Sequence, residues 1–242
     1  MSAYARGGRR LGPTATVAAL LAASTASAQP AYPSWVFFGS AEGGTSGFAS
    51  AGFKRGLTGG LYEPGLFLQG SLGSGNYSYR SRVVEGGRAT GRVLGASLMP
   101  GAQWSAGNTT FGFFVGPEIE RHWLTPPDPD NRARGTRWGL RGQIDIWSHP
   151  TPRTLVTATL IGGTAAPHLW SRLSAGYRLF EAFYFGPEAS AYASPDYREL
   201  RLGLHATGLT LRGLTFRLSG GLRIDSDDRT GAYAGLTTHA SY

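Results

Sequence analysis

The chain has 242 residues, a formal net charge of +8 at pH 7, 37 glycines and no cysteine. The lack of cysteine excludes a disulfide framework and a thiolate metal site. Glycine costs about 1 kcal/mol relative to alanine inside a helix, so the composition disfavours a helical protein and favours strands. The positive charge does not indicate nucleic-acid binding, because the basic residues are spaced singly between apolar residues rather than clustered.

The N-terminal segment has the three-part pattern of a secretory signal peptide. Three arginines precede an apolar stretch at 15–23, and the small residues at 26–28 form a cleavage site. The apolar stretch is too short to span a bilayer. We therefore predict a cleaved signal peptide at residues 1–28 and a single exported domain at residues 29–242. Subtracting the three arginines from +8 leaves a net charge of +5 for that domain.

The rest of the chain reads as short alternating segments separated by turns, and no apolar run in it is long enough for a transmembrane helix. Twelve strands are predicted, near 34–42, 48–56, 65–75, 91–104, 109–121, 136–147, 154–162, 169–179, 182–192, 199–208, 212–224 and 231–242. An even number is expected when both ends of a barrel lie on the periplasmic side, and strand boundaries are uncertain by several residues, so ten or fourteen strands remain open.

The alternation is clearest in the last third of the chain. Leucine or alanine at 200, 202, 204 and 206 interleaves with arginine, glycine, histidine and threonine. In a soluble sandwich the apolar face would meet a second sheet, whereas in a membrane barrel it meets lipid and the polar face lines the lumen. The signal peptide, the even strand count and the C-terminal aromatic Tyr242 favour an antiparallel transmembrane β-barrel in the outer membrane, with lipid as its partner.

Strand parity also predicts a group of inward-facing charges. The predicted luminal charge network consists of Glu118, Glu120, Arg137, Arg141, Glu188 and Arg201. Glu118 and Glu120 lie one strand before the first two arginines, so pairing across the hairpin is expected, and Glu188 with Arg201 would repeat it. Opposite charges on adjacent strands contribute about 0.2 to 1 kcal/mol. Such a network either fixes the barrel's shape or binds a ligand, and both interpretations remain open.

Several ordered blocks carry a family resemblance. These are Gly116-Pro117-Glu118, the later Gly186-Pro187-Glu188, the Asp and Pro-rich turn at 128–131, the tract at 197–203 and the opening at 36–39. Over essentially the whole exported domain the chain resembles the BcsS family of cellulose biosynthesis proteins. The resemblance implies an outer-membrane component of bacterial cellulose synthesis. The proline in each Gly-Pro pair removes a ladder donor, which predicts a local bulge.

Enzyme motifs do not occur in the sequence. There is no Gly-x-Ser-x-Gly elbow, zinc-binding His-Glu-x-x-His or Walker phosphate loop, and the five histidines are isolated. We predict no catalytic residues, cofactor or metal. The leading hypothesis is a non-enzymatic role in cellulose secretion or anchoring, with a cellulose chain and the secretion machinery as partners. Trp147, Tyr184 and Tyr192 are candidates for stacking on sugars. A narrow solute channel and a lipid-modifying barrel enzyme are the alternatives.

Overall fold

The computed structural model describes residues 33–44, 46–131, 133–195, 197–227 and 229–242. The expected signal peptide at 1–28 lies outside them. Within these ranges no helix is long and apolar enough to cross a membrane. The described residues form twelve strands: β1 Trp35–Gly43, β2 Gly47–Gly56, β3 Gly65–Arg80, β4 Arg88–Ala106, β5 Thr109–Thr125, β6 Gly135–Ser148, β7 Thr154–Gly163, β8 His168–Leu179, β9 Phe183–Ser194, β10 Tyr197–Leu211, β11 Leu214–Asp225 and β12 Thr230–Ser241.

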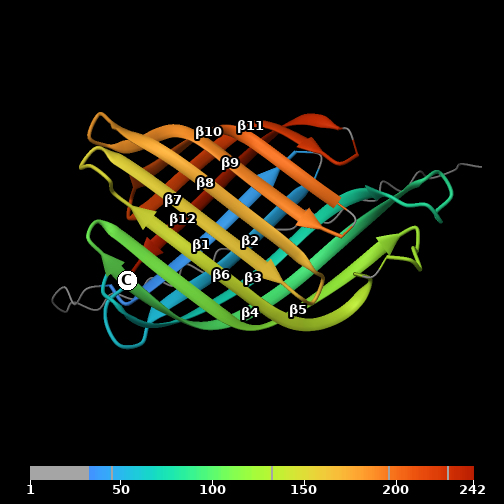
Figure 1. The fold of residues 1–242 in the computed structure, drawn as a ribbon, viewed down its shortest axis with the longest axis horizontal. Coiled ribbons are helices and arrows are strands. Elements are labelled where there is room, and N and C mark those ends of the chain that lie inside the picture. The colour runs from blue at the N-terminus through green and yellow to red at the C-terminus, as the bar shows by residue number, and fades with distance from the viewer. Residues whose placement is uncertain (1–32, 45, 132, 196, 228) are drawn as a thin grey trace, which may run out of the picture. The chain divides into compact units, whose positions relative to one another are not determined.

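Each strand pairs antiparallel with its neighbours in sequence, and β12 pairs with β1 to close the barrel (Figure 1). Val36 faces Ser241 in the closing register, and the backbones of Trp35 and Tyr242 exchange two hydrogen bonds of 2.9 and 2.8 Å. Closure leaves no unpaired strand edge. The predicted twelve-strand barrel is confirmed. We call the end that holds Trp35 and Tyr242 the terminal end and the opposite end the loop end.

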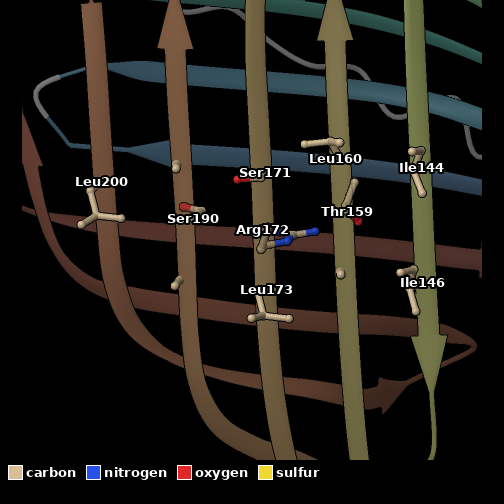
Figure 2. Close-up of a pocket in the computed structure, with 12 residues that line it drawn as sticks. Ile144, Ile146, Thr159, Leu160, Ser171, Arg172, Leu173, Ser190 and Leu200 are labelled. Atoms are coloured by element: carbon tan, nitrogen blue, oxygen red, sulfur yellow. The ribbon is translucent and has the colours of Figure 1, made fainter.

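The predicted alternation places apolar side chains outside and polar side chains inside. On β10, Leu200, Leu202 and Leu204 are 45%, 54% and 52% exposed, whereas the interleaved Glu199 and His205 are buried. Exposed leucines in continuous rows are unfavourable in water but favourable against lipid. Figure 2 shows part of this outer wall, where a hollow of about 520 Å³ crosses β6 to β10 among leucine and isoleucine side chains.

Three strands continue at least three residues further towards the loop end than the sequence predicted. β3, β4 and β5 extend towards the loop end beyond the expected 65–75, 91–104 and 109–121. Tyr79 and Ala89 face each other across this extension and form a buried apolar cluster with Val84. The predicted strands left residues 76–90 as a link, but ring packing between the strands extends the ladder into this segment.

The two Gly-Pro pairs occupy equivalent places in the barrel. On β5 and β9 the pairing with the preceding strand is interrupted around them and resumes in the same register. A Cβ on Gly116 would lie 2.1 Å from the carbonyl oxygen of Leu98, and one on Gly186 would lie 2.1 Å from that of Ala175, so both sites require glycine. The predicted bulge is wrong at these positions. The register shift lies instead between Thr207 and Leu209, in the pairing of β10 with β11.

Apolar side chains fill part of the lumen near the terminal end. Phe67, Met99 and Phe114 are at most 1% exposed and pack with Leu61, which belongs to the link between β2 and β3. The backbone N–H of Leu61 donates to Pro33, and its carbonyl accepts from Gln103. The link therefore folds against inward-facing side chains and forms a small hydrophobic core inside the barrel.

Candidate functional site

The candidate site is a cavity of about 730 Å³ inside the barrel. All twelve strands contribute to its lining, because inward positions of every strand face the same axis. The volume lies in the range of ordinary ligand pockets. Its charged lining residues are Glu42, Lys54, Glu118, Glu120, Arg141, Asp145, Arg172, Glu199, Arg201, Arg223 and Arg229. Among the described residues, no group of three or more histidine or carboxylate side chains is placed to hold a metal ion.

The most connected part of this lining lies on β10 and β11. Arg201 and Arg223 are directly paired across the two strands, and the carboxylate of Glu199 binds both, at 2.5 Å to Nε of Arg201 and 2.7 Å to Nη1 of Arg223. Arg201 also pairs with Glu42 of β1 at 2.5 Å, and Arg223 with Asp225 at 3.1 Å. Buried charges are costly unless paired, and here each arginine has two carboxylate partners.

Charged groups also connect the β3–β4 hairpin with the β11–β12 link at the loop end. The guanidinium of Arg229 donates to the hydroxyl and the carbonyl of Ser78, at 3.0 and 3.2 Å. Arg80 donates to the carbonyl of Asp227 at 3.0 Å. Asp225 accepts bonds from the Arg229 side chain and backbone, which holds that arginine in place. These contacts join segments about 150 residues apart in sequence on one side of the cavity mouth.

Glu188 forms a second buried network, and the predicted pairing with Arg201 is wrong. Its carboxylate binds Arg217 of β11 and accepts a 3.4 Å hydrogen bond from Tyr233 of β12. The reason is local register: Gly203 stands opposite Glu188, whereas Arg201 stands opposite Ser190. A Cβ on Gly203 would lie 2.5 Å from the hydroxyl of Tyr233, so glycine at this position leaves room for the tyrosine to reach the carboxylate.

Glu118 lies near one of its two predicted partners. Its carboxylate is 3.7 Å from Nη1 of Arg141, which is a close contact rather than a hydrogen bond. Oε1 of Glu118 accepts bonds of 2.8 and 2.9 Å from the backbone N–H groups of Thr164 and Ala165. Glu118 therefore binds the β7–β8 turn as well as approaching an arginine, and no sequence pattern predicts the turn contact.

Glu120 and Arg137 do not form the predicted ion pair. They are direct partners in the β5–β6 register, but Arg137 is exposed near the rim and forms no ion pair with any residue of the described ranges. Glu120 instead lies 3.1 Å from Nε2 of His122, whose Nδ1 is 2.8 Å from the hydroxyl of Tyr77. At an open rim, water solvates an arginine well enough that a partner is not required.

The three candidate sugar-stacking residues do not gather in one place. Tyr192 lines the cavity and stacks on His168, with ring centroids 6.0 Å apart. Trp147 and Tyr184 lie towards the terminal end of their strands, both close to His149, and neither lines the cavity. Trp170 does line it, directly opposite Tyr192 in the β8–β9 register. Trp170 lies two residues before Arg172 in the predicted strand at 169–179, so the alternation alone could have placed it on the inner face.

A closed twelve-strand barrel with an apolar outer wall and a charged lumen has the architecture of outer-membrane β-barrel proteins. The family model of the cellulose biosynthesis protein BcsS matches residues 36–242, and the chain belongs to this family. A search of curated proteins found no match.

Two solved structures show the same fold at low sequence identity. An outer membrane channel from Pseudomonas putida F1 is similar with a TM-score of 0.54 and 11% identity, covering 89% of this chain and 97% of that one. The transport unit of the autotransporter AIDA-I from Escherichia coli is similar with a TM-score of 0.52 and 9% identity, covering 93% and 94%. At such identities the likeness concerns the barrel and not its activity.

Proposed function

We propose that this chain is a non-enzymatic outer-membrane protein that supports the secretion or surface anchoring of cellulose. The observation that carries the proposal is the luminal cavity, in which fixed charges and the rings of Trp170 and Tyr192 face one space in a member of a cellulose biosynthesis family. A glucan presents hydroxyl groups to charged and polar side chains and C–H faces to aromatic rings. A twelve-strand barrel is wider than the eight-strand barrels that side chains fill completely.

The proposed location follows from the outer wall and the N-terminal segment. Rows of exposed leucine suit lipid, and a signal peptide at 1–28 would deliver the chain through the inner membrane. The proposed partners are the outer-membrane lipid, a cellulose chain and the cellulose secretion machinery. Synthesis from a sugar nucleotide belongs to other proteins in this proposal.

The proposal is tested by deleting the gene and measuring two quantities in the same cells. Extracellular cellulose is expected to fall or to be misplaced, while the cellulose synthase activity of isolated inner membranes stays unchanged. Re-expression of the full chain should restore cellulose output. Normal amount and placement of cellulose in the deletion strain would contradict the proposal, and loss of synthase activity would indicate a role in regulating synthesis instead.

A narrow solute channel is the second candidate, and the same cavity supports it. A channel gives stable conductance in planar bilayers, whereas a barrel whose lumen is filled by side chains gives little. The lipid-modifying enzyme has less support. Its best candidate, His205, is buried, with Nδ1 2.8 Å from the hydroxyl of Thr207 and Nε2 3.2 Å from the carbonyl of Ala175, so both ring nitrogens already have partners. An unchanged lipid profile on overexpression is expected.

A further inference from the structure

One arginine of the cavity differs from the others in having no anionic partner. Arg201, Arg223 and Arg229 each bind carboxylates, but Arg172 of β8 forms no hydrogen bond or ion pair with any residue of the described ranges. Its guanidinium packs against the ring of Trp170, whose centroid lies 5.2 Å from the guanidinium carbon. Figure 2 shows its nitrogens extending from β8 towards β7, where Thr159 lies.

The carboxylates around Arg172 are already engaged by other groups. Glu188, Glu42 and Asp145 act on Arg172 electrostatically. Glu188 binds Arg217, and Glu42 binds Arg201. Asp145 accepts hydrogen bonds from Gln143 at 2.7 Å and from Thr159 at 3.0 Å. In the ladder, neutral Thr159 and Ser190 stand on either side of Arg172. The five N–H donors of this guanidinium therefore remain available to a ligand.

A second arginine facing the same cavity also has unused donor capacity. Nε of Arg141 is buried and has no hydrogen-bond partner within the described residues, and its contact with Glu118 is as long as 3.7 Å. A buried donor without a partner destabilises the protein, so such a group is best satisfied by water or by a bound anion. The guanidinium groups of Arg172 and Arg141 therefore face one space with N–H donors that have no hydrogen-bond partner within the described residues.

Aromatic groups lie in the same stretch of wall. Trp170 packs against the guanidinium of Arg172, and the stacked pair of Tyr192 and His168 lies beside it on β9 and β8. Guanidinium groups bind carboxylate and phosphate in a two-pronged geometry, and aromatic rings pack against the C–H faces of sugars. Together they define a site for a sugar that carries an oxyanion.

We propose that the lumen contains a binding site for acidic saccharide chains, in which Arg172 binds a carboxylate or phosphate group while a neighbouring sugar ring packs on Tyr192. Arg141 on β6, separated from β8 only by β7, provides a second cationic group on the same side of the cavity. The inference rests on the proposed handling of a glucan by this barrel and narrows it, because it assigns the lumen a preference for chains with negatively charged substituents.

This inference is tested by titration calorimetry, in which saccharide probes are added to the full-length mature protein in detergent. The probes are cellohexaose, the same oligosaccharide with carboxylated sugars, and the same oligosaccharide with phosphate esters. Both charged probes should bind about tenfold more tightly than cellohexaose, with an affinity that falls as salt rises. A preference for only one charged probe assigns the site to carboxylate or to phosphate.

Single substitutions distinguish a specific role of Arg172 in binding from a general effect of positive charge. Arg172→Gln should remove the preference for charged probes, Arg172→Lys should keep part of it, and Arg137→Gln should leave it unchanged because Arg137 lies outside the cavity. A slower or faster gel mobility of unheated protein confirms that each variant forms the closed barrel. If Arg172→Gln does not fold, the salt dependence and the probe preference of the native protein still test whether the lumen binds acidic saccharides.

Each outcome has a definite meaning. Equal affinity of the native protein for neutral and charged probes contradicts the acidic-saccharide site but still supports handling of a neutral glucan. Retention of the full preference in Arg172→Gln contradicts the assignment to Arg172. Lack of binding by all three probes contradicts both this inference and direct contact between the lumen and a glucan.

Discussion

Arg201 and Arg223 face each other directly across β10 and β11, and the single carboxylate of Glu199 binds both guanidinium groups. Like charges in directly opposed positions repel, so this pairing persists only because carboxylates lie between and around the two side chains. Arg223 is 1% exposed, which leaves water little access to it. Glu199 is therefore the residue on which the stability of this wall depends most.

Replacing Glu199 by glutamine should destabilise the barrel by about 3 to 5 kcal/mol, because two buried guanidinium groups lose a shared counter-charge. The free energy of unfolding in urea, followed in detergent or lipid, measures the effect. Glu181→Gln is a matched control, since Glu181 pairs with arginine at the surface with its side chain 66% exposed, and should change stability by less than about 1 kcal/mol. Equal effects of the two variants would show that the luminal pairing is not important.

A double-mutant cycle on Glu118 and Arg141 should show coupling. The single change Glu118→Leu removes the carboxylate that lies 3.7 Å from Arg141 and two bonds to the β7–β8 turn, whereas the double change with Arg141→Leu also removes the guanidinium that loses this carboxylate. We expect a non-additive term of about 0.5 to 3 kcal/mol in the free energy of unfolding. In a second cycle that combines Glu118→Leu with Arg137→Leu, the two changes in the free energy of unfolding should add. Coupling to Arg137 instead of Arg141 would contradict the observed geometry.

The β5–β6 link should loosen in acid because of Asp128. Burial alone would raise the pKa of Asp128, but hydrogen bonds from Ser81, Tyr79 and two backbone N–H groups outweigh burial and lower its pKa. The stabilisation is therefore complete above the unfolded value of about 3.9 and is lost as pH falls through the lower folded value.

Hydrogen exchange measures this loss. The Asp130 amide, which donates to Asp128 at 3.0 Å, should show a smaller protection factor once the carboxyl is protonated. Asp128→Asn serves as the control, and its protection in this range should not depend on pH. A wild-type protection factor that is constant down to pH 2 would disprove the role of the carboxylate.

The contacts of Arg229 with Ser78 should hold the β3–β4 hairpin against the β11–β12 link. Arg229→Gln removes two hydrogen bonds across the mouth, so tryptic cleavage at Arg82, in the link between β3 and β4, is expected to be faster in the intact protein. Arg198→Gln changes an exposed arginine nearby whose side chain forms no hydrogen bond or ion pair with the described residues, and it should leave the cleavage rate unchanged. Identical rates in the native protein and Arg229→Gln would mean that other contacts hold the hairpin.

The sequence determined the strands and the side of the wall on which each residue lies. A strand repeats every two residues, so the rows at 200–206 and the inward positions of Glu118, Glu188 and Arg201 follow from local spacing alone. The even strand number and the apolar exterior follow from the same pattern. The extension of β3 and β4 was missed because rings at 77–79 pack on neighbouring strands, and a local pattern does not include such contacts.

The tertiary structure decided which inward groups meet. Arg201 binds Glu42, a residue 159 positions away, because closure of the barrel leaves only β12 and β11 between β1 and β10. Glu188 binds Arg217 of β11 and Tyr233 of β12, two strands that are not its neighbours in the sheet. Arg172 is left without an anion because the surrounding carboxylates bind other partners. Parity is a property of one strand, whereas pairing depends on the closure and stagger of all twelve, and no local stretch of sequence contains that information.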